Sequence, residues 1–348
     1  MSRWRRWLRA LVLGLAIAYP VSLLVLVIVL RGFGTWWMAR ALLYAPRIFL
    51  AAPLLVFVPL LAWMRAWRFL ASQAVALLLV LFPLMGLVLP WPRFTDKGQP
   101  VLRVMSYNVN GGNWGWHNVL SQVDELHPDV LLIQEAVGDT RWTLEQLRKR
   151  FPVVEQSTQF IVATRYAIRA TVDPARVQQG DRQRSPRSMR YLMDTPLGPI
   201  AFYNLHPISP RHGLWSLRVG GFRNAIKSGT LFDKQRTRAL EMDGQLSDLQ
   251  VSLCADNARK ETVPVIIAGD TNLTGLHPAL SHLSGYADGF KEASWGFGYT
   301  FPSGRRSWMR LDRIFAGPQL RVVGFQVGKH DAASDHRAVS ADIQRSKP

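Results

Sequence analysis

The first ninety residues of the chain contain no aspartate, no glutamate and no lysine. Nine arginines are the only charged side chains there. All 24 acidic residues therefore lie in the rest of the 348-residue chain, together with the other 33 of the 42 basic residues. The net charge of +18 divides equally between two parts of very different composition. This division predicts two structural units and favours anionic partners without selecting one.

The chain is also poor in cysteine and has no repeats. Cys254 is the single cysteine, which excludes an internal disulfide and leaves the redox compartment open. We find no internal repeat and no low-complexity tract in the sequence. The fold and the compartment must therefore be inferred from hydrophobic patterning and from motifs.

What the first part does contain is three long apolar runs, Ala10–Leu30, Ile48–Met64 and Phe69–Leu89. Each approaches the ~20 residues that a helix needs to cross a bilayer. A secretory signal would end after one short run and a cleavage site. The prolines within the runs are compatible with membrane helices, because neighbouring helices satisfy the backbone groups that proline leaves free. Residues 1–90 are therefore expected to form about three transmembrane helices.

The flanking arginines predict the orientation of these helices. Arg3, Arg5, Arg6 and Arg9 favour a cytoplasmic N-terminus, because cytoplasmic ends carry an excess of basic residues. Three crossings then place everything after Pro90 outside the cytoplasm. Arg31, Arg40 and Arg47 in the first outer loop oppose this arrangement. If the middle run does not span, the second part of the chain is cytoplasmic.

The second part, residues 101–348, alternates strand-like and helical patterns after a short linker at residues 91–100. Mixed elements of this kind predict an α/β (α+β) fold with helices that cover sheet faces. Residues 173–188 and 209–233 are polar and are expected to be long surface loops. The expected strands are Val101–Tyr107, Val130–Gln134, Phe160–Thr164, Arg190–Met193, Ile200–Leu205 and Val263–Ala268, and the expected helices are Val119–His127, Trp142–Arg150 and Lys234–Asp256.

Polar residues that suit phosphate chemistry stand at the ends of these apolar runs. Side chains that leave a sheet there can meet in one cleft, and buried charges are costly unless they are paired or bind a metal. Taken singly, each has a structural alternative: a turn former, a core histidine, a turn cap, or an ion pair of Asp312 with Arg310 or Arg313. The candidates in chain order are Asn108, Glu135, His206, Asp270, Asn272, Asp312, Asp335 and His336.

Taken together, five motifs resemble the endonuclease/exonuclease/phosphatase superfamily over residues 101–343. They occur in the order that the family shows and at plausible separations. Two departures, Thr271 and Arg313, remove no catalytic group, whereas His206 stands in the loosest match. The five motifs are Ser106–Asn110, Asp129–Glu135, Ala268–Asn272, Arg310–Phe315 and Ser334–Arg337.

The resemblance implies a four-layer αββα sandwich with the site at one edge, between the two sheets. It implies that Glu135 is the main metal ligand, with Asn108 and Asp335 close to the same ion. Asp270 and Asn272 would orient the attacking water and hold phosphoryl oxygens. His336 would be a general base or a phosphate contact that Asp312 orients, and His206 would be an acid or a phosphate ligand.

The implied ion is Mg²⁺ or Mn²⁺. A hard, six-coordinate cation takes oxygen ligands and retains several waters, so one or two carboxylates and an amide suffice. Zinc is disfavoured because the sequence offers no evident cluster of histidine and cysteine. Imidazole, with a reference pKa of ~6.5, suits proton transfer near neutral pH.

Three functions remain in competition because fold does not select a substrate. The layout is similar to that of small glycopeptide-resistance membrane proteins, which implies a multi-pass protein of a bacterial-type inner membrane that hydrolyses a lipid-linked phosphate or pyrophosphate outside the cytoplasm. A membrane-anchored nuclease is the alternative, with basic loops and Trp215 and Trp308 as nucleic-acid contacts. A non-catalytic binding module would have lost one of Glu135, Asp270, Asn272 and His336, and all four are present.

Overall fold

The structure is a computed structural model that describes residues 3–89, 101–174, 178–179, 182–183, 186–210, 214, 234–329 and 333–346. The expected linker at residues 91–100 lies outside the described residues, as does most of the expected loop at residues 209–233. The chain divides into two compact units. The first contains Met1–Val88 with the short segment Thr274–Pro278, and the second contains Leu89–Leu273 and Ala279–Pro348.

The first unit is helical. It contains α1 (Arg3–Gly32), α2 (Trp37–Leu43), a 3₁₀ turn (Arg47–Ala51), α3 (Leu54–Trp63) and α4 (Trp67–Leu79), which continues as a π-helical turn (Val80–Leu84). Apolar side chains of α1 pack against those of α4 and its extension, with Leu23 and Val27 beside Ala76 and Val80. Gln73 of α4 also donates a hydrogen bond to the Ala16 carbonyl of α1 over 2.8 Å.

The segment Thr274–Pro278 belongs to this helical unit. Leu276 lies in its apolar cluster. Arg47 Nη2 donates to Thr274 Oγ1 over 3.2 Å, and Arg40 Nη1 lies 3.3 Å from His277 Nε2. Because a guanidinium only donates, His277 Nε2 is the acceptor of this hydrogen bond.

Among the described residues, two helices are long and apolar enough to cross a membrane, Arg3–Gly32 and Trp67–Leu84. The expected middle run, Ile48–Met64, forms a 3₁₀ turn followed by α3. α3 has 10 residues, which is about 15 Å of helix, whereas a bilayer core is about 30 Å thick. Trp37–Leu43 and Arg47–Trp63 together are apolar enough for one further span but are bent by 91° at the break. The number of crossings stays a prediction.

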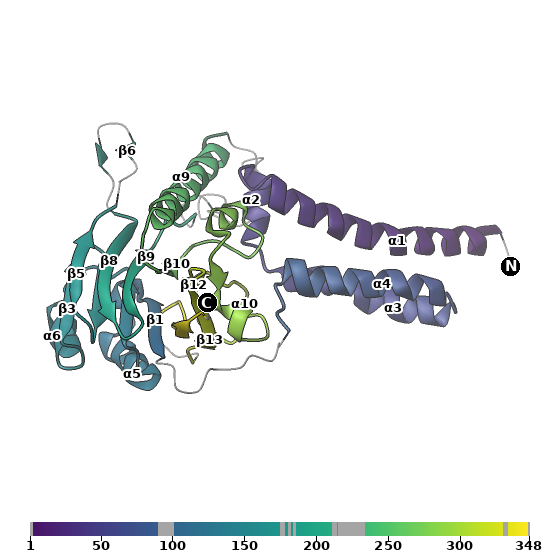
Figure 1. The fold of residues 1–348 in the computed structure, drawn as a ribbon. Coiled ribbons are helices and arrows are strands. Elements are labelled where there is room, and N and C mark those ends of the chain that lie inside the picture. The colour runs from purple at the N-terminus through teal and green to yellow at the C-terminus, as the bar shows by residue number, and fades with distance from the viewer. Residues whose placement is uncertain are drawn as a thin grey trace. The chain divides into compact units, whose positions relative to one another are not determined.

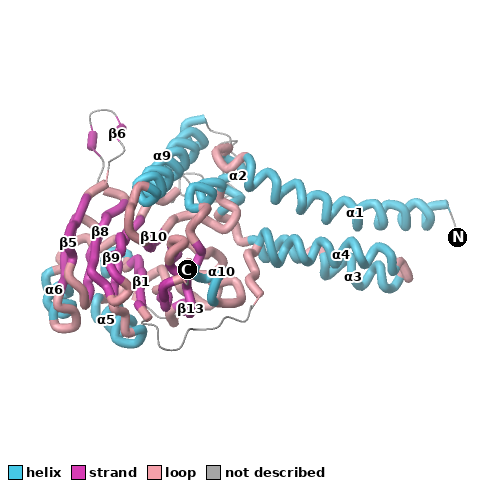
Figure 2. Tube along the Cα trace, viewed as in Figure 1, coloured by secondary structure: helices cyan, strands magenta, loops and turns pink. Residues whose placement is uncertain are grey.

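The second unit is a two-sheet α/β sandwich, as expected (Figures 1 and 2). The first sheet has the order β13 (Leu320–Val327), β14 (Val339–Arg345), β1 (Leu102–Asn108), β2 (Val130–Gln134), β4 (Phe160–Thr164) and β3 (Val153–Ser157). The second has the order β11 (Ala287–Asp288), β12 (Asp312–Ala316), β10 (Val265–Asp270), β9 (Gly198–Leu205), β8 (Ser188–Thr195) and β5 (Ile168–Val172). A separate small hairpin, β6 (Gln178–Gln179) and β7 (Arg182–Gln183), lies within the expected loop at residues 173–188.

Helices cover the outer face of each sheet. α5 (Trp116–Leu126) and α6 (Arg141–Arg148) pack on the first sheet, where Val119 and Leu147 join the cluster formed by β1, β2 and β4. α9 (Lys234–Arg259) packs on the second sheet through Val251 and Ala255. Figure 1 shows α5 and α6 on one side of the strands and α9 on the other. The four layers are therefore helix, sheet, sheet and helix.

One glycine is required for β9 and β10 to lie side by side. Gly269 has a φ of 154°, and a Cβ there would lie 1.8 Å from the Leu205 carbonyl oxygen. No side-chain rotation relieves this contact, because the obstructing atom belongs to the backbone. Gly269 directly precedes Asp270, so the close approach also sets the position of that carboxylate.

We predict that Gly269→Ala destabilises the sandwich by about 3 kcal/mol or more, in the range of severe core substitutions. Thermal unfolding of the purified chain, followed by circular dichroism, measures the effect. Gly285→Ala is the matched control, because Gly285 has a φ of 99° but no atom lies within 4 Å of the place that an added methyl group would take. Only a backbone cost of about 1 kcal/mol is therefore expected there. Equal losses for the two variants would refute the steric explanation.

Candidate active site

The candidate residues gather at one edge of the sandwich because of how the strands pair. β1 and β2 are parallel, as are β9 and β10, so the four strands deliver Asn108, Glu135, His206 and Asp270 from their carboxyl ends. Within each sheet the carboxyl ends of parallel strands emerge on the same edge. Residues from both sheets therefore lie within hydrogen-bonding distance of one another, as the sequence predicted for these four.

Asp312, Asp335 and His336 reach the site differently from the expectation that each candidate follows a strand. Asp312 is the first residue of β12, and Asp335 and His336 precede β14. β12 is antiparallel to β10 and β14 is antiparallel to β1, so their amino ends lie at the edge where β10 and β1 end. Asp312 is the register partner of Asp270. The strand-end expectation was thus wrong for these three residues.

Asn108 links the two sheets at the site. Its Nδ2 donates to Glu135 Oε1 over 3.0 Å and to Asp270 Oδ2 over 2.9 Å. Its Oδ1 accepts the Asn110 backbone N–H over 3.0 Å. The side chain is buried, as is that of Asp270, while the Glu135 side chain is one-third exposed. In this arrangement Asn108 holds the two carboxylates in place as a donor.

His206 faces the same two carboxylates. Its Nε2 lies 3.2 Å from Glu135 Oε1 and 3.7 Å from Asp270 Oδ2. Its Nδ1 lies 2.6 Å from Gln159 Oε1, an acceptor, which assigns a proton to Nδ1. Although its motif was the loosest match, the structure brings His206 fully into the cluster.

Asp312 and His336 form the second half of the site. Asp312 Oδ2 lies 2.8 Å from His336 Nδ1, and His336 Nε2 lies 3.5 Å from Asp270 Oδ2. All three side chains are buried. The expected orientation of His336 by Asp312 is therefore the geometry that the structure has. Arg310 and Arg313, the alternative partners of Asp312, instead form ion pairs with Asp288 at 2.8 and 3.0 Å.

Asn272 lies in the turn after β10 and has a left-handed φ of 51°. Its backbone N–H donates to Asp270 Oδ1 over 2.8 Å, and its Nδ2 donates to the Pro207 carbonyl over 3.0 Å. The turn brings Asn272 beside Asp270, as the motif implied. The amide also ties the β10 turn to the chain that follows His206.

Asp335 is half-buried. It belongs neither to the group of Glu135, His206 and Asp270 nor to the group of Asp270, Asp312 and His336. Its carboxylate Oδ1 lies 3.5 Å from Ser334 Oγ, and its backbone carbonyl accepts the Ser303 N–H over 2.7 Å. Its negative charge contributes to the electrostatics of His336. Its role as a metal ligand stays a prediction.

The buried charges shift the pKa values of one another. Burial raises the pKa of Glu135, but hydrogen bonding to His206, the charge of that imidazole and the Asn108 amide outweigh it and hold the pKa at about 2. Burial raises the pKa of Asp270, and the neighbouring Asp312 charge adds to this effect. Burial lowers the pKa of His336, yet the charges of Asp312 and Asp270 prevail and raise it to about 10. Without a metal, His336 is therefore an imidazolium at neutral pH.

The donor set fits a divalent cation. Two groups have ligand atoms within 4.8 Å of one another, Glu135 with His206 and Asp270, and Asp270 with Asp312 and His336. His206 Nε2 and Asp312 Oδ1 are buried and lack a well-aligned hydrogen bond to the described residues. Carboxylate oxygens crowded in this way are stabilised by a bound cation. The two histidines in these groups weaken the sequence argument against zinc, because His and carboxylate sets also bind Zn²⁺.

Sequence reasoning missed several residues that hold the site together. Gln159 precedes β4 and carries no motif, yet it is the partner of His206 Nδ1. Thr300 Oγ1 accepts the Asp312 N–H over 3.2 Å, and Ser334 Oγ donates to the Asn108 carbonyl over 2.8 Å. Only Ser334 stood inside a motif. Gln159 and Thr300 are brought in by tertiary structure alone, so no local signal identified them.

Structures with a similar fold exist at low sequence identity. An endonuclease/exonuclease/phosphatase family protein from Bacteroides thetaiotaomicron is 15% identical, with a TM-score of 0.52, and the match covers 72% of this chain and 100% of that one. A 3′–5′ exonuclease from Neisseria meningitidis is 14% identical, with a TM-score of 0.51, and the match covers 70% and 100%. Among curated proteins none matches the chain.

A two-sheet sandwich with carboxylates and imidazoles joined at one edge defines a class of enzyme, the metal-dependent phosphoester hydrolases. The chain belongs to the endonuclease/exonuclease/phosphatase family, whose model matches residues 105–336. The match includes all eight candidate residues and ends on His336.

The raised pKa of His336 predicts a pH dependence of stability in EDTA. Because the folded pKa of about 10 exceeds the unfolded value of about 6.5, the contribution is complete below pH 6.5 and is lost as the pH rises through 10. The melting temperature of the wild type minus that of His336→Asn should therefore shrink between these limits. The substitution also changes packing, but that effect on the melting temperature does not vary with pH and so does not affect the trend. A constant difference from pH 6 to 10 would contradict a charged His336.

Proposed function

We propose that the chain is a Mg²⁺-dependent phosphatase or phosphodiesterase that acts at a membrane surface on a lipid-linked phosphate or pyrophosphate, with its sandwich outside the cytoplasm. The observation that carries the proposed chemistry is the buried group formed by Glu135, His206 and Asp270 beside the Asp312–His336 pair. Mg²⁺ held by Glu135 and neighbouring oxygens would neutralise charge on the phosphoryl group and polarise water.

The residues of the chain divide the remaining work. Asp270 is the candidate acceptor for a proton of the attacking water, because its raised pKa makes it a stronger base than an exposed aspartate. Asn272, fixed beside it, is suited to contact a phosphoryl oxygen. Without a metal, the charges of Asp312 and Asp270 raise the pKa of His336, which favours the phosphate-contact role over that of general base. His336 instead donates to a phosphoryl oxygen while Asp312 holds the opposite nitrogen.

The membrane part of the proposal rests on the helical unit. Its two apolar helices could span, and the absence of acidic residues before residue 91 leaves only arginines near their ends. A hydrolase tethered to a bilayer meets lipid headgroups at a high effective concentration. This favours a lipid-linked substrate over one that is free in solution.

A nuclease is the second candidate, since the fold is shared with a 3′–5′ exonuclease. The basic surface expected for it receives little support from the described residues. Arg190 is engaged by Glu261 over 2.5 Å and is unavailable to phosphate. The expected basic surface comprises Arg182, Arg184, Arg187, Arg190, Arg211, Arg218 and Arg223. Arg187 is described and half-buried, whereas the side chains of Arg182, Arg184, Arg211, Arg218 and Arg223 lie outside the described residues, as does Trp215.

Hydrolysis tests the proposed chemistry. The full chain in detergent with Mg²⁺ should release phosphate from a polyprenyl diphosphate, and EDTA should stop the release. Asp270→Asn and His336→Asn should each lower kcat by about 10² to 10⁴, the usual size of proton-transfer and charge-stabilisation effects. Asp139→Asn is the matched control, because Asp139 is an exposed carboxylate in an ion pair with Arg141.

The same experiment separates the two candidates and the ions. Nicking of plasmid DNA that Asp270→Asn abolishes, without release from the diphosphate, would replace the phosphatase by the nuclease. Activity restored by Zn²⁺ but not by Mg²⁺ or Mn²⁺ would overturn the proposed ion. Hydrolysis of neither substrate by a folded wild type would refute the proposed function.

A second prediction concerns topology. Three crossings place the C-terminus outside the cytoplasm, whereas the two long apolar helices alone would return it to the side of the N-terminus. Alkaline phosphatase fused after Pro348 should therefore be active in a bacterial host, and a fluorescent protein fused there should be dark if it is exported unfolded. An inactive phosphatase fusion with a bright fluorescent fusion would exclude an extracytoplasmic site.

A further inference from the structure

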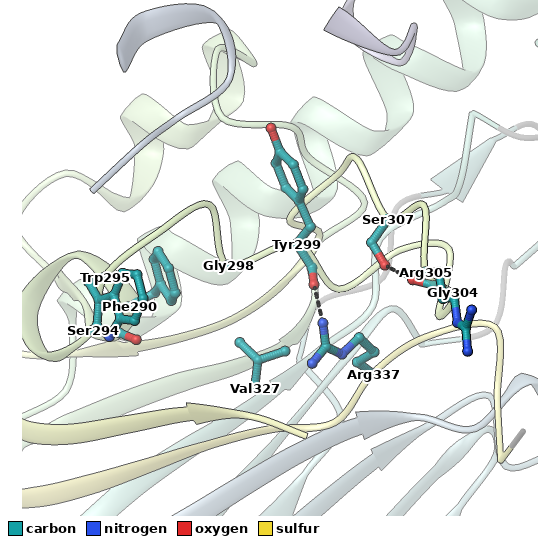
Figure 3. Close-up of a pocket in the computed structure, with 10 residues that line it drawn as sticks. All are labelled: Phe290, Ser294, Trp295, Gly298, Tyr299, Gly304, Arg305, Ser307, Val327 and Arg337. Atoms are coloured by element: carbon teal, nitrogen blue, oxygen red, sulfur yellow. Dashed lines mark hydrogen bonds between the residues drawn. The ribbon is translucent and has the colours of Figure 1, made fainter. Parts of the chain in front are cut away.

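The second unit contains a pocket that is separate from the carboxylate–imidazole cluster. It has a volume of about 380 Å³, within the range of small-molecule sites. Figure 3 shows Phe290, Ser294 and Trp295 at one end and Arg305 and Ser307 at the other, with Arg337 between them. None of the eight candidate residues lines it.

The charge of the pocket is positive. Two arginines and no acidic residue line it, which favours an anionic ligand. Arg337 Nε donates to the Gly328 carbonyl over 2.8 Å, and its Nη1 donates to the Tyr299 carbonyl over 3.4 Å. These contacts fix the guanidinium in the pocket, as Figure 3 shows for Tyr299.

Arg305 supplies the second positive charge from a short turn. Ser307 Oγ lies 2.8 Å from the Gly304 carbonyl and 2.6 Å from that of Pro302, and the Gly304 N–H donates to Pro302 over 2.8 Å. The turn is thus held by its own hydrogen bonds. The Arg305 side chain is exposed and makes no hydrogen bond or ion pair with the residues that the structure describes. Its donors are therefore available to a ligand.

The other end of the pocket is aromatic. Trp295 is 73% exposed, more than any other large apolar side chain among the described residues of the second unit. Phe290, which lines the same end, is buried, with the Arg310 guanidinium 4.8 Å from its ring centre and Phe325 in edge contact. An exposed indole beside a fixed aromatic wall is suited to cover an apolar part of a ligand.

The pocket adjoins the catalytic residues through shared backbone. Arg337 directly follows His336, and its N–H donates to the Thr300 carbonyl over 2.9 Å. Thr300 also contacts Asp312, and the Phe301 ring lies 4.7 Å from the His336 ring. The segment from Tyr299 to Ser307 therefore borders the pocket and the catalytic site alike.

We propose that this pocket binds an organic phosphate, with the phosphate group on Arg305 and Arg337 and the attached apolar group against Trp295. In the hydrolase it holds a part of the substrate that is remote from the attacked phosphorus, so this role rests on the proposed function. Arg305 and Trp295 are then specificity-determining residues. The ligand chemistry has two sources, a nucleotide with an aromatic base and a lipid phosphate with an apolar chain.

Binding without metal tests the pocket independently of catalysis. Titration calorimetry of the full chain in detergent and EDTA would use adenosine monophosphate, geranyl phosphate and inorganic phosphate. At least one organic phosphate should bind more tightly than inorganic phosphate. Arg305→Ala should weaken that binding about tenfold, as expected for the loss of one charge-assisted hydrogen bond. Trp295→Ala should lower the affinity for the organic phosphate and leave the affinity for inorganic phosphate unchanged.

Arg306→Ala is the matched control, because Arg306 is also exposed but does not line the pocket. It should leave all three affinities unchanged. With Mg²⁺ and the hydrolysed substrate, Arg305→Ala should raise KM and leave kcat near the wild-type value. Preference for geranyl phosphate assigns the pocket to lipid phosphates, and preference for adenosine monophosphate assigns it to nucleotides.

The results that would overturn the proposed pocket differ from those that would overturn the proposed function. Equal effects of Arg305→Ala and Arg306→Ala, or equal affinity for organic and inorganic phosphate, would overturn the pocket even if hydrolysis is observed. If the chain binds an organic phosphate in a way that depends on Arg305 and Trp295 but hydrolyses neither substrate, the proposed pocket is supported and the proposed enzymatic function is refuted.

Discussion

The structure of the site depends on the burial of one carboxylate, that of Asp270, where the two sheets meet. A buried charge of this kind is tolerated only where donors and cations surround it. Asn108 donates from the opposite sheet, the Asn272 N–H donates from the adjoining turn, and the imidazoles of His206 and His336 lie within 3.7 Å. Because these partners come from separate strands, the position of Asp270 requires both sheets to be formed and in register. The site can therefore be complete only when both sheets of the sandwich are formed.

The surrounding structure is built to hold these partners still. Glu135 has a left-handed φ of 56° and Asn272 has one of 51°, and such backbone strain persists only where its surroundings fix it. Between the sheets, buried Gln134 donates to Asn204 Oδ1 over 2.7 Å, and Asn204 donates to the Ile133 carbonyl over 3.0 Å. Gln134, which forms this bridge, directly precedes Glu135 in the sequence. Polar groups so far inside the protein cost stability unless they are satisfied, and here they lock the two sheets at the site.

The sequence carries the residues of the site more clearly than it carries the architecture around them. β2 and β4 coincide with the expected strands because each is a short, fully buried apolar run. The strands β12, β13 and β14 were not among the expected strands, and this is why the strand-end expectation fails for Asp312 and His336. Contacts such as that of Gln159 with His206 depend on pairing between distant segments, which no local pattern encodes. The bend between Trp37–Leu43 and Arg47–Trp63 has a local cause, because Pro46 has no backbone N–H with which to continue the helix.

The charges of the site explain why a cation is needed for binding as well as for chemistry. Three carboxylates, those of Glu135, Asp270 and Asp312, lie in the cluster, and the charge of the His336 imidazolium is already balanced by Asp312. A phosphate that approaches this edge without a metal therefore meets net negative charge in a region of low dielectric, where repulsion between like charges is strong. A divalent cation reverses the sign of the site and makes it complementary to a phosphoryl group. The cluster thus recognises phosphate only when it is loaded, whereas the pocket around Arg305 is positive at all times. Selection among phosphoesters must then come from residues beyond the cluster, because the cluster itself reads only the phosphoryl group that all of them share.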